Sequence, residues 1–376
     1  MTRPTTPLSD SERLDWLCLS RGENVGPITF FDLLRIYGSA GEALKALPEL
    51  ARRGGRRGRI KLYSRDRAAA EAEALAAIGG RLVALTEPDY PVALAAISDP
   101  PPVISVLGHG HVMNRDTVAI VGARNASAVG GRFARELAAE LGAEGYTIAS
   151  GLARGIDTQA HVGALPTGTV AVVAGGVDVI YPPDNAELYR QIAEAGAVIS
   201  EQPLGMEPRG RHFPRRNRII SGLAFGLVVV EASLRTGSLI TARLAGEQGR
   251  EVFAVPGSPL DPRHRGTNNL IRQGAVLTES ARDVVEALRG MTRPKLDEPP
   301  IRAPADMPGG GGGEISLENR QIVIDLLGPS PVAVDEIIRQ CQLTPTEVLT
   351  VLLELELAGH LARHSGGAVS IDMKKT

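Results

Sequence analysis

Six polar loops in the middle of the chain could bind phosphate groups, because four of them combine glycine with arginine or hydroxyl side chains. They read GARNAS (122–127), SGLARGID (150–157), GGVDVIYPPDN (175–185), SEQP (200–203), EASLRTGSLITA (231–242) and PGSPLDPRHRGTN (256–268). Glycine lets backbone N–H groups approach an anion, helix N-termini direct such donors towards it, and arginine offers a planar fork for phosphate oxygens. We therefore predict that these loops form a phosphate-binding surface.

Two arginine-rich runs stand out against a net charge of −2, a balance that on average argues against nucleic-acid binding. Residues 52–61 (RRGGRRGRIK) and 209–218 (RGRHFPRRNR) hold five arginines each. For the first run, a solvated basic face and a binding role are equally open. The second run contains Phe213 and continues directly into the apolar IISGLAFG. We therefore predict that the arginines of the second run line a site.

The loops and the second run supply the candidate phosphate- or DNA-binding residues. These are Gly122, Arg124, Ser150, Gly151, Arg154, Gly155, Gly175, Arg215, Arg216, Asn217, Arg218, Ser238, Gly257 and Thr267. The dinucleotide fingerprint G-x-G-x-x-G and the Walker A loop are both missing, and no Ser/His/Asp or Cys/His set is recognisable. Asp157 and His161, four residues apart, are interpreted as a structural pair. We predict no catalytic residue, no metal and no cofactor.

The loops follow six short apolar runs, which indicates how the chain positions them. The runs are VAIV (118–121), TIA (147–149), VAVVA (170–174), AVI (197–199), LVVV (227–230) and VFAV (252–255), with helical sequence between them. Such runs are typical of strands buried on both faces, and their alternation with helices predicts a parallel sheet whose ligands lie beyond the strands' carboxyl ends. We predict an α/β fold with a Rossmann-like, doubly wound, mostly parallel core over residues 81–290.

Residues 1–80 predict a helical module. An amphipathic stretch over residues 8–20 precedes NVGPITFFDLLRIYGSAGEALKAL, in which Gly26 and Pro27 open the second helix. The pattern resembles helix-hairpin-helix or SAM-like modules, which can present turn amides to DNA phosphates. A small helical bundle without that role would have the same pattern.

The C-terminal part contains a linker and a further domain. Residues 291–316 hold five prolines and five consecutive glycines, a composition typical of a flexible tether. Residues 317–376 predict a winged helix, with three helices and a hairpin that turns at Gly366–Gly367. The third helix, from Pro345, contains three glutamates and no lysine or arginine, so a phosphate backbone would repel it. Contact with a partner or with the chain itself explains this helix better than duplex reading.

The length and the cysteine content narrow the class of protein. A chain of 376 residues suits two or three domains, and its two cysteines, Cys18 and Cys341, exclude a disulfide framework and a cysteine-rich metal site. No stretch has the character of a signal peptide, and no run of ~18 apolar residues occurs. We expect a soluble cytoplasmic protein with no membrane contact.

The motifs, in their order, resemble the DNA-processing protein A family (DprA, also called Smf). The resemblance covers about residues 81–288 and rests on VGARNAS, SGLARGIDTQAH, AVVAGGVDVIYPPDN, GAVISEQP, FPRRNRIISGLAFGLVVVEASLRTGSLITARLAGEQGREVFAVPG and GTNNLIRQGAVL. It implies single-stranded DNA binding, homodimerisation through the core, protection of incoming strands, and their delivery to the recombinase RecA in natural transformation of competent cells. It also places Arg124 in a positively charged pocket.

One departure from the family affects this pocket. Family members often have a lysine after the Tyr-Pro of the third loop, whereas this chain reads YPPDN, with Pro183 and Asp184. Either the run 209–218 compensates for the missing cation, or strands bind more weakly than in typical members.

Two other functions remain open beside a non-catalytic strand binder. Related Rossmann-like enzymes hydrolyse the glycosidic bond of nucleoside monophosphates with a PGGxGT loop. This chain has Pro256–Gly257 and Gly266–Thr267, but eight residues separate them. A scaffold for RecA-like partners with a vestigial anion pocket is the other alternative. We predict the binder and not an enzyme.

Overall fold

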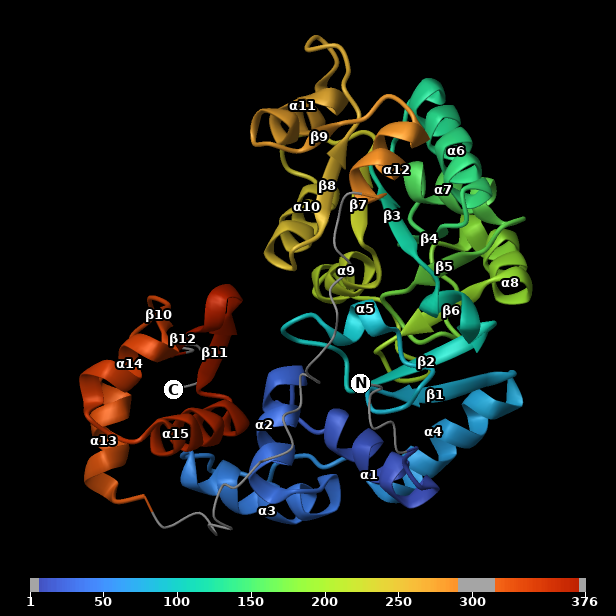
Figure 1. Cartoon of the computed structure of the whole chain (residues 1–376). Helices are drawn as coiled ribbons and strands as arrows, with labels where there is room; N and C mark the ends of the chain where they lie inside the picture. Colours follow the sequence, from blue (N-terminus) through green and yellow to red (C-terminus); the bar gives the residue numbers. More distant parts are fainter. Residues whose placement is uncertain (1–6, 290–314, 372–376) are drawn as a thin grey trace. The chain divides into compact units, whose positions relative to one another are not determined.

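The computed structural model describes residues 7–289 and 315–371. These residues form two compact units (Figure 1). The sheet unit comprises residues 7–8 and 69–289, and the helical unit combines residues 9–68 with residues 315–371. Most of the predicted linker, residues 291–314, lies outside the described residues. Among the helices described, none is both long and apolar enough to cross a membrane.

A nine-stranded sheet forms the centre of the sheet unit, in the order β1-β2-β6-β5-β4-β3-β7-β8-β9. Its strands are β1 (Gly80–Ala84), β2 (Val103–Gly108), β3 (Thr117–Val121), β4 (Thr147–Ser150), β5 (Thr169–Val172), β6 (Ala197–Ser200), β7 (Gly226–Val229), β8 (Glu251–Ala254) and β9 (Val276–Leu277). Pairing is parallel from β6 through β3 to β9, whereas β2 pairs antiparallel with both β1 and β6. The predicted doubly wound, mostly parallel sheet is therefore confirmed.

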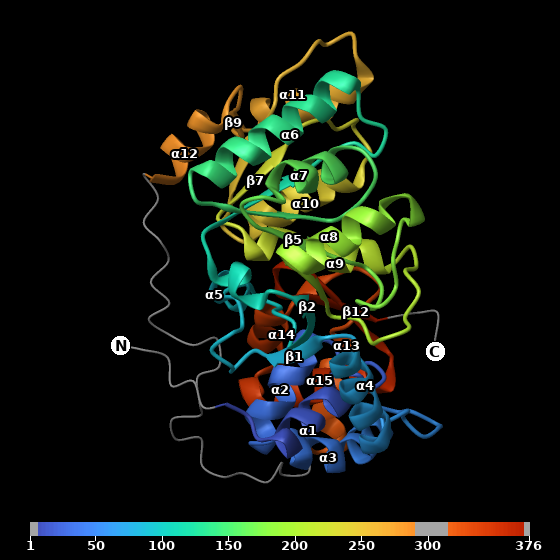
Figure 2. The ribbon, with the colours of Figure 1, turned by 90° about the vertical axis from the view of Figure 1, so that its right-hand side faces the viewer.

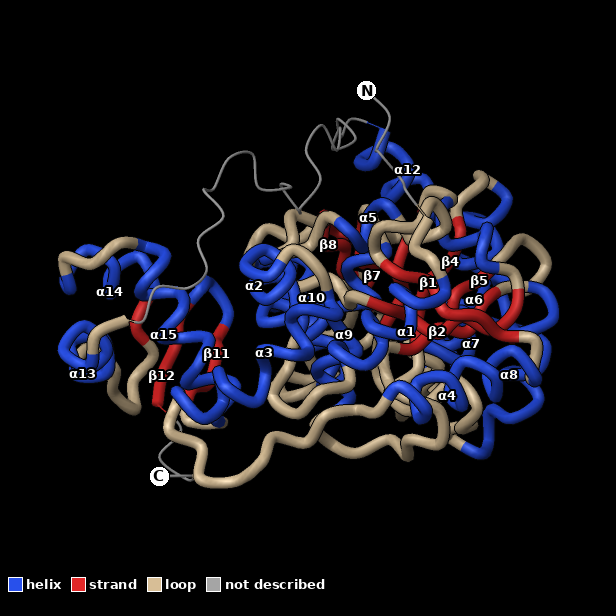
Figure 3. Tube along the Cα trace, turned by 90° about the horizontal axis from the view of Figure 1, so that it is seen from below, coloured by secondary structure: helices blue, strands red, loops and turns tan. Residues whose placement is uncertain are grey.

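Helices cover both faces of this sheet. They are α4 (Arg65–Ala77), α5 (Val92–Ala95), α6 (Ala128–Ala143), α7 (Ile156–Ala164), α8 (Ala186–Ala195), α9 (His212–Leu223), α10 (Gly237–Glu247), α11 (Arg265–Arg272) and α12 (Ala281–Arg289). Figure 2 shows α6, α7 and α8 in front of the strands, and Figure 3 shows the strands in red among the surrounding helices. Helices α9 and α10 pack against β3–β5 and β7–β8.

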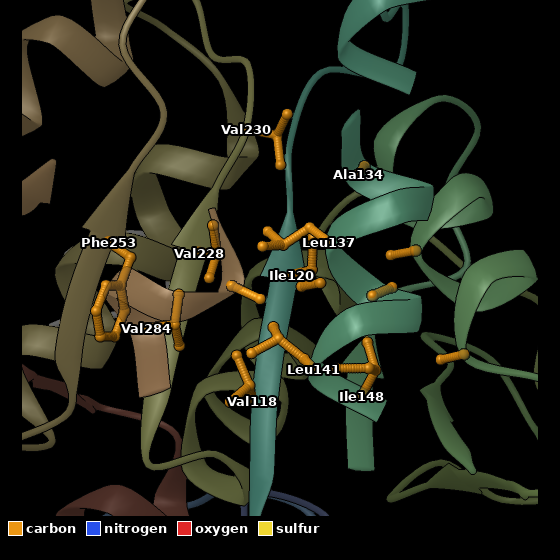
Figure 4. Close-up of a cluster of buried hydrophobic side chains, with 14 of the residues drawn as sticks. Val118, Ile120, Ala134, Leu137, Leu141, Ile148, Val228, Val230, Phe253 and Val284 are labelled. Atoms are coloured by element: carbon orange, nitrogen blue, oxygen red, sulfur yellow. The ribbon is translucent and has the colours of Figure 1, made fainter. Parts of the chain in front are cut away.

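The main core of the sheet unit lies between the central strands and α6, α7 and α12. Strand residues such as Ile120, Ile148 and Val228 are fully buried and pack against Leu137 and Leu141 of α6 (Figure 4). Burial on both faces favours short β-branched runs without alternation, as the sequence shows. This packing fixes the carboxyl ends of the strands, from which the site is built.

The helical unit contains an N-terminal three-helix module and a winged helix. The first comprises α1 (Asp10–Ser20), α2 (Pro27–Tyr37) and α3 (Ala40–Arg53). The second comprises α13 (Leu317–Asp325), α14 (Val334–Cys341), α15 (Pro345–Ala358), β10 (Val332–Ala333), β11 (Leu361–His364) and β12 (Ala368–Ile371). Ser9 and Thr344 form capping boxes at α1 and α15, and Gly359 ends α15 in the left-handed conformation. Both predicted flanking modules are confirmed.

Candidate nucleic-acid interface

The direction of the chain through the sheet reverses between β3 and β7, where open α/β sheets bind their ligands. In this chain a carboxylate side chain of the protein occupies that position. Glu231, fully buried after β7, accepts hydrogen bonds from the backbone N–H (2.9 Å) and hydroxyl of Ser127, the N-cap of α6. A Cβ at Gly130 would lie 2.4 Å from the Glu231 Oε1 atom. The Glu231 carboxylate therefore takes the place at the start of α6 where a pyrophosphate would bind.

A second buried carboxylate occupies the neighbouring loop after β4. Asp157, in the first turn of α7, accepts hydrogen bonds from the backbone N–H groups of Gly151 (3.2 Å) and Ala153 (3.4 Å). Burial raises the pKa of Asp157, while the nearby Arg216 guanidinium and the backbone donors oppose the shift. The amides of this glycine-containing loop are thus bound to an internal acid.

Arg216 of α9 lies directly above this loop. The residue is only 6% exposed, yet its side chain forms no hydrogen bond or ion pair with any residue that the structure describes. A Cβ at position 151 would lie 1.6 Å from its Nη1 atom, so only glycine leaves room for the guanidinium. Burial lowers the pKa of Arg216 to about 10, a shift that Asp157 opposes, and the group remains protonated near pH 7.

An exposed arginine and an aromatic ring adjoin Arg216, and a second aromatic ring contacts the first. The guanidinium carbon of Arg124, in the loop after β3, lies 5.2 Å from the ring centroid of Phe213, and that of Arg216 lies 6.0 Å from the same ring. The ring centroids of Tyr181 and Phe213 lie 5.9 Å apart, and Tyr181 is 45% exposed. The charge of Arg124 lowers the pKa of Arg216, as expected for two neighbouring cations. An anion placed between them would relieve this repulsion. We call Arg124, Gly151, Phe213 and Arg216 the arginine pocket.

The acid in the YPPDN loop is neutralised within the sheet unit. Asp184, in the short 3-10 helix Pro183–Asn185, pairs with the Nε atom of Arg154 at 2.6 Å, and both side chains are exposed. Asn185 donates a hydrogen bond to the backbone carbonyl of Leu152, which joins this loop to the loop after β4. Asp184 therefore places no unpaired negative charge beside the arginine pocket.

Other predicted arginine and amide residues have internal partners. Arg218, 7% exposed, pairs with Glu201 and Asp99, and Asn217 donates to the Gly237 carbonyl at 3.3 Å. Arg215 is exposed to solvent. The structure thus separates Arg216 from Arg218, which it holds in an ion-pair network.

The predicted hydroxyl residues and Gly257 also bond internally. Ser150 donates to the Ile120 carbonyl, Ser238 bonds to Thr236, Thr267 donates to the His264 carbonyl, and the Gly257 amide donates to Asn268. Gly122, Gly155 and Gly175 lie where loops pack closely. At Gly155, with φ of 83°, a Cβ would be 2.2 Å from the Ala123 carbonyl oxygen. These glycines position the loops.

The sequence predicts Arg124 and Arg216 as site residues, a prediction that stands, but it gave no expectation for the buried acids beside them. Glu231 directly follows the apolar run LVVV (227–230). An acid at the end of a buried run is the sequence feature that could have indicated an internal carboxylate. Asp157 was taken as a structural partner of His161, but the Nδ1 atom of His161 bonds to the Thr169 hydroxyl at 2.7 Å instead. Burial, reinforced by Arg216, lowers the pKa of His161 to about 3. His161 therefore stays neutral beneath the arginine pocket.

The fold defines a Rossmann-like protein with an arginine cluster at the carboxyl ends of its central strands, and the same chain carries a three-helix module and a winged helix. The chain belongs to the DNA recombination-mediator protein A family, whose model matches residues 81–289. Models of the DprA-like N-terminal HHH domain and the DprA winged helix domain match residues 10–74 and 314–367. The resemblance found in the sequence is thus confirmed, and the protein is a DNA-processing protein of the DprA/Smf type.

Named relatives and solved structures agree with this assignment. Protein Smf of Escherichia coli K12 is 40% identical over 287 residues, which cover 75% of each chain. The DNA processing protein DprA of Bacillus subtilis is 42% identical over 213 residues, or 56% of this chain and 72% of that protein. The structure of DprA from Streptococcus pneumoniae has a TM-score of 0.61 at 34% identity and covers 75% of this chain and 98% of that chain.

A structure from Helicobacter pylori bears on the ligand of the relatives. It is described as giving insight into the single-stranded DNA binding mode of DNA processing protein A. Its TM-score to this chain is 0.50 at 30% identity, with 53% of this chain and 92% of that chain covered.

Proposed function

We propose that the protein binds single-stranded DNA in the arginine pocket, protects incoming strands in the cytoplasm, and delivers them to the recombinase RecA during recombination and natural transformation. In this proposal the protein acts as a homodimer through the sheet unit. It needs no cofactor, and the pocket catalyses no reaction. Arg124 and Arg216 contact phosphate oxygens, while Tyr181 and Phe213 offer apolar contact to the sugar or base.

The observation that carries the proposal is that Arg216 is buried and its guanidinium lacks a hydrogen-bond acceptor among the described residues. The Arg216 guanidinium is 6% exposed and donates no hydrogen bond to any described residue, although Asp157 lies close enough to act on its pKa. Buried N–H groups without an acceptor are costly for the fold. Arg124 adds a second cation beside it. A bound phosphate would supply the missing acceptor to both groups. The DNA named for the H. pylori relative carries such groups at regular intervals.

The glycosidic-bond hydrolase has no comparable support. The residues that suggested it, Gly257 and Thr267, bond within their own loop and lie outside the arginine pocket. Release of free base from a nucleoside monophosphate would restore this alternative.

Binding of labelled oligothymidine to the full chain tests the proposal. We expect tight, salt-dependent binding of the single strand, weaker binding of a duplex of equal length, and loss of affinity in Arg124→Ala. Arg132→Ala, which removes an exposed arginine of α6 with a weak pairing to Glu136, is the matched control. Equal losses in the two variants would remove the arginine pocket from the binding site.

RecA delivery and dimerisation need separate measurements. Sedimentation equilibrium should give twice the mass of the chain. The wild type should speed RecA filament growth on a strand that is already coated with single-strand-binding protein, whereas Arg124→Ala should not. A monomer, or stimulation that does not depend on Arg124, would contradict this part of the proposal.

A further inference from the structure

An exposed ion pair lies on two loops that border the arginine pocket. Arg154, in the loop after β4, pairs through its Nε atom with a carboxylate oxygen of Asp184 at 2.6 Å. The two side chains are 63% and 59% exposed, so a ligand can reach both of them from solvent. The Nη atoms of Arg154 bond to no residue that the structure describes. Most of the donors of this guanidinium are therefore open to an anion.

The loop that carries Arg154 packs against the loop that carries Arg124. At Gly155, the residue after Arg154, a Cβ would lie 2.7 Å from the carbonyl oxygen of Arg124. The backbone N–H of Ile156 also donates a hydrogen bond to the Ala123 carbonyl at 3.2 Å. The backbones of the two loops are therefore in direct contact, and Arg154 lies beside the arginine pocket.

The loop that carries Asp184 also contacts the arginine pocket. Tyr181, three residues earlier, has its ring centroid 5.9 Å from that of Phe213. Asn185, the next residue, is 6% exposed, and its side chain donates a hydrogen bond at 2.9 Å to the Leu152 carbonyl in the loop after β4. The residues on both sides of Asp184 therefore hold its carboxylate at the edge of the pocket.

A carboxylate and a phosphate compete for the same guanidinium donors. Single-stranded DNA carries one negative charge at each nucleotide, so a strand held by Arg124 and Arg216 brings further phosphates to the neighbouring loops. An ion pair between exposed groups contributes little free energy, because solvent screens it and both side chains lose freedom. A strand phosphate can therefore take the place of Asp184 at Arg154.

We propose that Arg154 is a further phosphate contact for a bound strand, and that Asp184 competes with the phosphate for this guanidinium. Asp184 thereby lowers the affinity for single strands without touching the strand. This inference rests on the single-strand function proposed above, which uses Arg124 and Arg216 and gives the pair of Arg154 and Asp184 no role. The pair makes Asp184 a residue that sets the strength of strand binding.

A double-mutant cycle in the full chain tests this competition. The variants are Asp184→Asn, Arg154→Gln and the double substitution, all at exposed side chains, and the probe is labelled oligothymidine. We expect Asp184→Asn to raise affinity about threefold, within the range of an exposed ion pair. Arg154→Gln should lower affinity about twofold in the wild type but about sixfold in Asp184→Asn. In the second background it should also make the slope of log K against log salt shallower by about 0.7, the share of one phosphate contact.

Glu187→Gln is the matched control for the change in net charge, because Glu187 forms an exposed ion pair with Arg190 on α8. This variant should bind oligothymidine as the wild type does. An equal rise in Glu187→Gln and Asp184→Asn would show that only the net charge matters. An effect of Asp184→Asn that is the same with and without Arg154, or no effect at all, would also overturn the proposal.

Arg124→Ala separates this inference from the function on which it rests. If Arg124→Ala loses affinity while the cycle shows no coupling, the arginine pocket binds the strand and the role of Arg154 is refuted. If the coupling is present but Arg124→Ala binds as the wild type does, the strand contacts Arg154 and the arginine pocket is not its site. The proposal predicts both a loss of affinity in Arg124→Ala and coupling between Arg154 and Asp184.

Discussion

The two arginine-rich runs contain five arginines each but differ in what surrounds them. In residues 52–61, Arg52 and Arg53 pair with Glu49 at the surface, and Arg56 pairs with Glu23. In residues 209–218, Arg216 is buried beside Asp157 and the exposed Arg124, and it makes no hydrogen bond to any described residue. Surface ion pairs contribute little and exchange easily with solvent. The comparison teaches that burial and missing partners, more than the number of cations, distinguish an anion site from a basic surface.

The largest expected effect comes from removing the buried cation. Arg216→Met should lower affinity for oligothymidine by at least ~30-fold, since a buried charged contact is lost. The same change should lower the free energy of unfolding by about 3 kcal/mol, because the buried Asp157 loses the cation beside it. Anisotropy titration and urea denaturation measure the two quantities. Arg52→Met, in the other run, should change neither; a parallel loss in both variants would erase the contrast between the runs.

Moving the guanidinium without removing it should have a smaller effect. A methyl group in Gly151→Ala would overlap the Nη1 atom of Arg216 and force the side chain aside. We expect oligothymidine affinity to fall about tenfold, which corresponds to weakening one hydrogen bond between charged groups. Gly246→Ala, in α10 with open space around it in the described part of the chain, is the control. Wild-type affinity in Gly151→Ala would mean that the position of Arg216 is not important.

Salt dependence separates arginines that bind phosphate from those that stabilise the fold. The slope of log K against log salt should become shallower by about 0.7 in Arg124→Ala, the share of one single-strand phosphate contact. Arg218→Ala should leave the slope unchanged but destabilise the protein by about 3 kcal/mol, because Glu201 loses its buried partner. A shallower slope in Arg218→Ala would place this residue back in the site.

The last contrast concerns His161, which lies beneath the arginine pocket and contacts no ligand in this account, so its effect is on stability alone. The pKa of His161 is about 3 in the folded chain, below its usual 6.5, so the unfolded state binds the extra proton. The contribution of His161 to the free energy of unfolding is fully present above about pH 6.5. It decreases as the pH falls towards 3, by at most about 1.4 kcal/mol per pH unit. The raised pKa of Asp157 has the opposite effect on the free energy of unfolding, because the folded state binds this proton more readily as the pH falls. Urea denaturation between pH 7 and 4 should show a shallower decrease in His161→Gln than in wild type, and parallel curves would contradict this account.

The sheet could be predicted because its local signals agree. Runs such as LVVV have the composition of strands buried on both faces, and capping residues such as Ser127 and Thr344 mark helix starts. The site could be predicted only in part. Glu231 and Ser127 are 104 residues apart, and no local pattern shows that the acid takes the donors of α6. Arg216 and Arg218 lie two residues apart on α9, about 200° around the helix, so one faces the pocket and the other an ion-pair network.

The most direct test of the central claim is a crystal structure of the full chain with a short oligothymidine. The claim is that the buried Arg216, whose guanidinium lacks a hydrogen-bond acceptor among the described residues, and its neighbour Arg124 form the strand-binding site. We predict a phosphate oxygen within hydrogen-bond distance of the Arg216 guanidinium and a second contact from Arg124. A strand bound along residues 52–61, with no phosphate at Arg216, would contradict the claim.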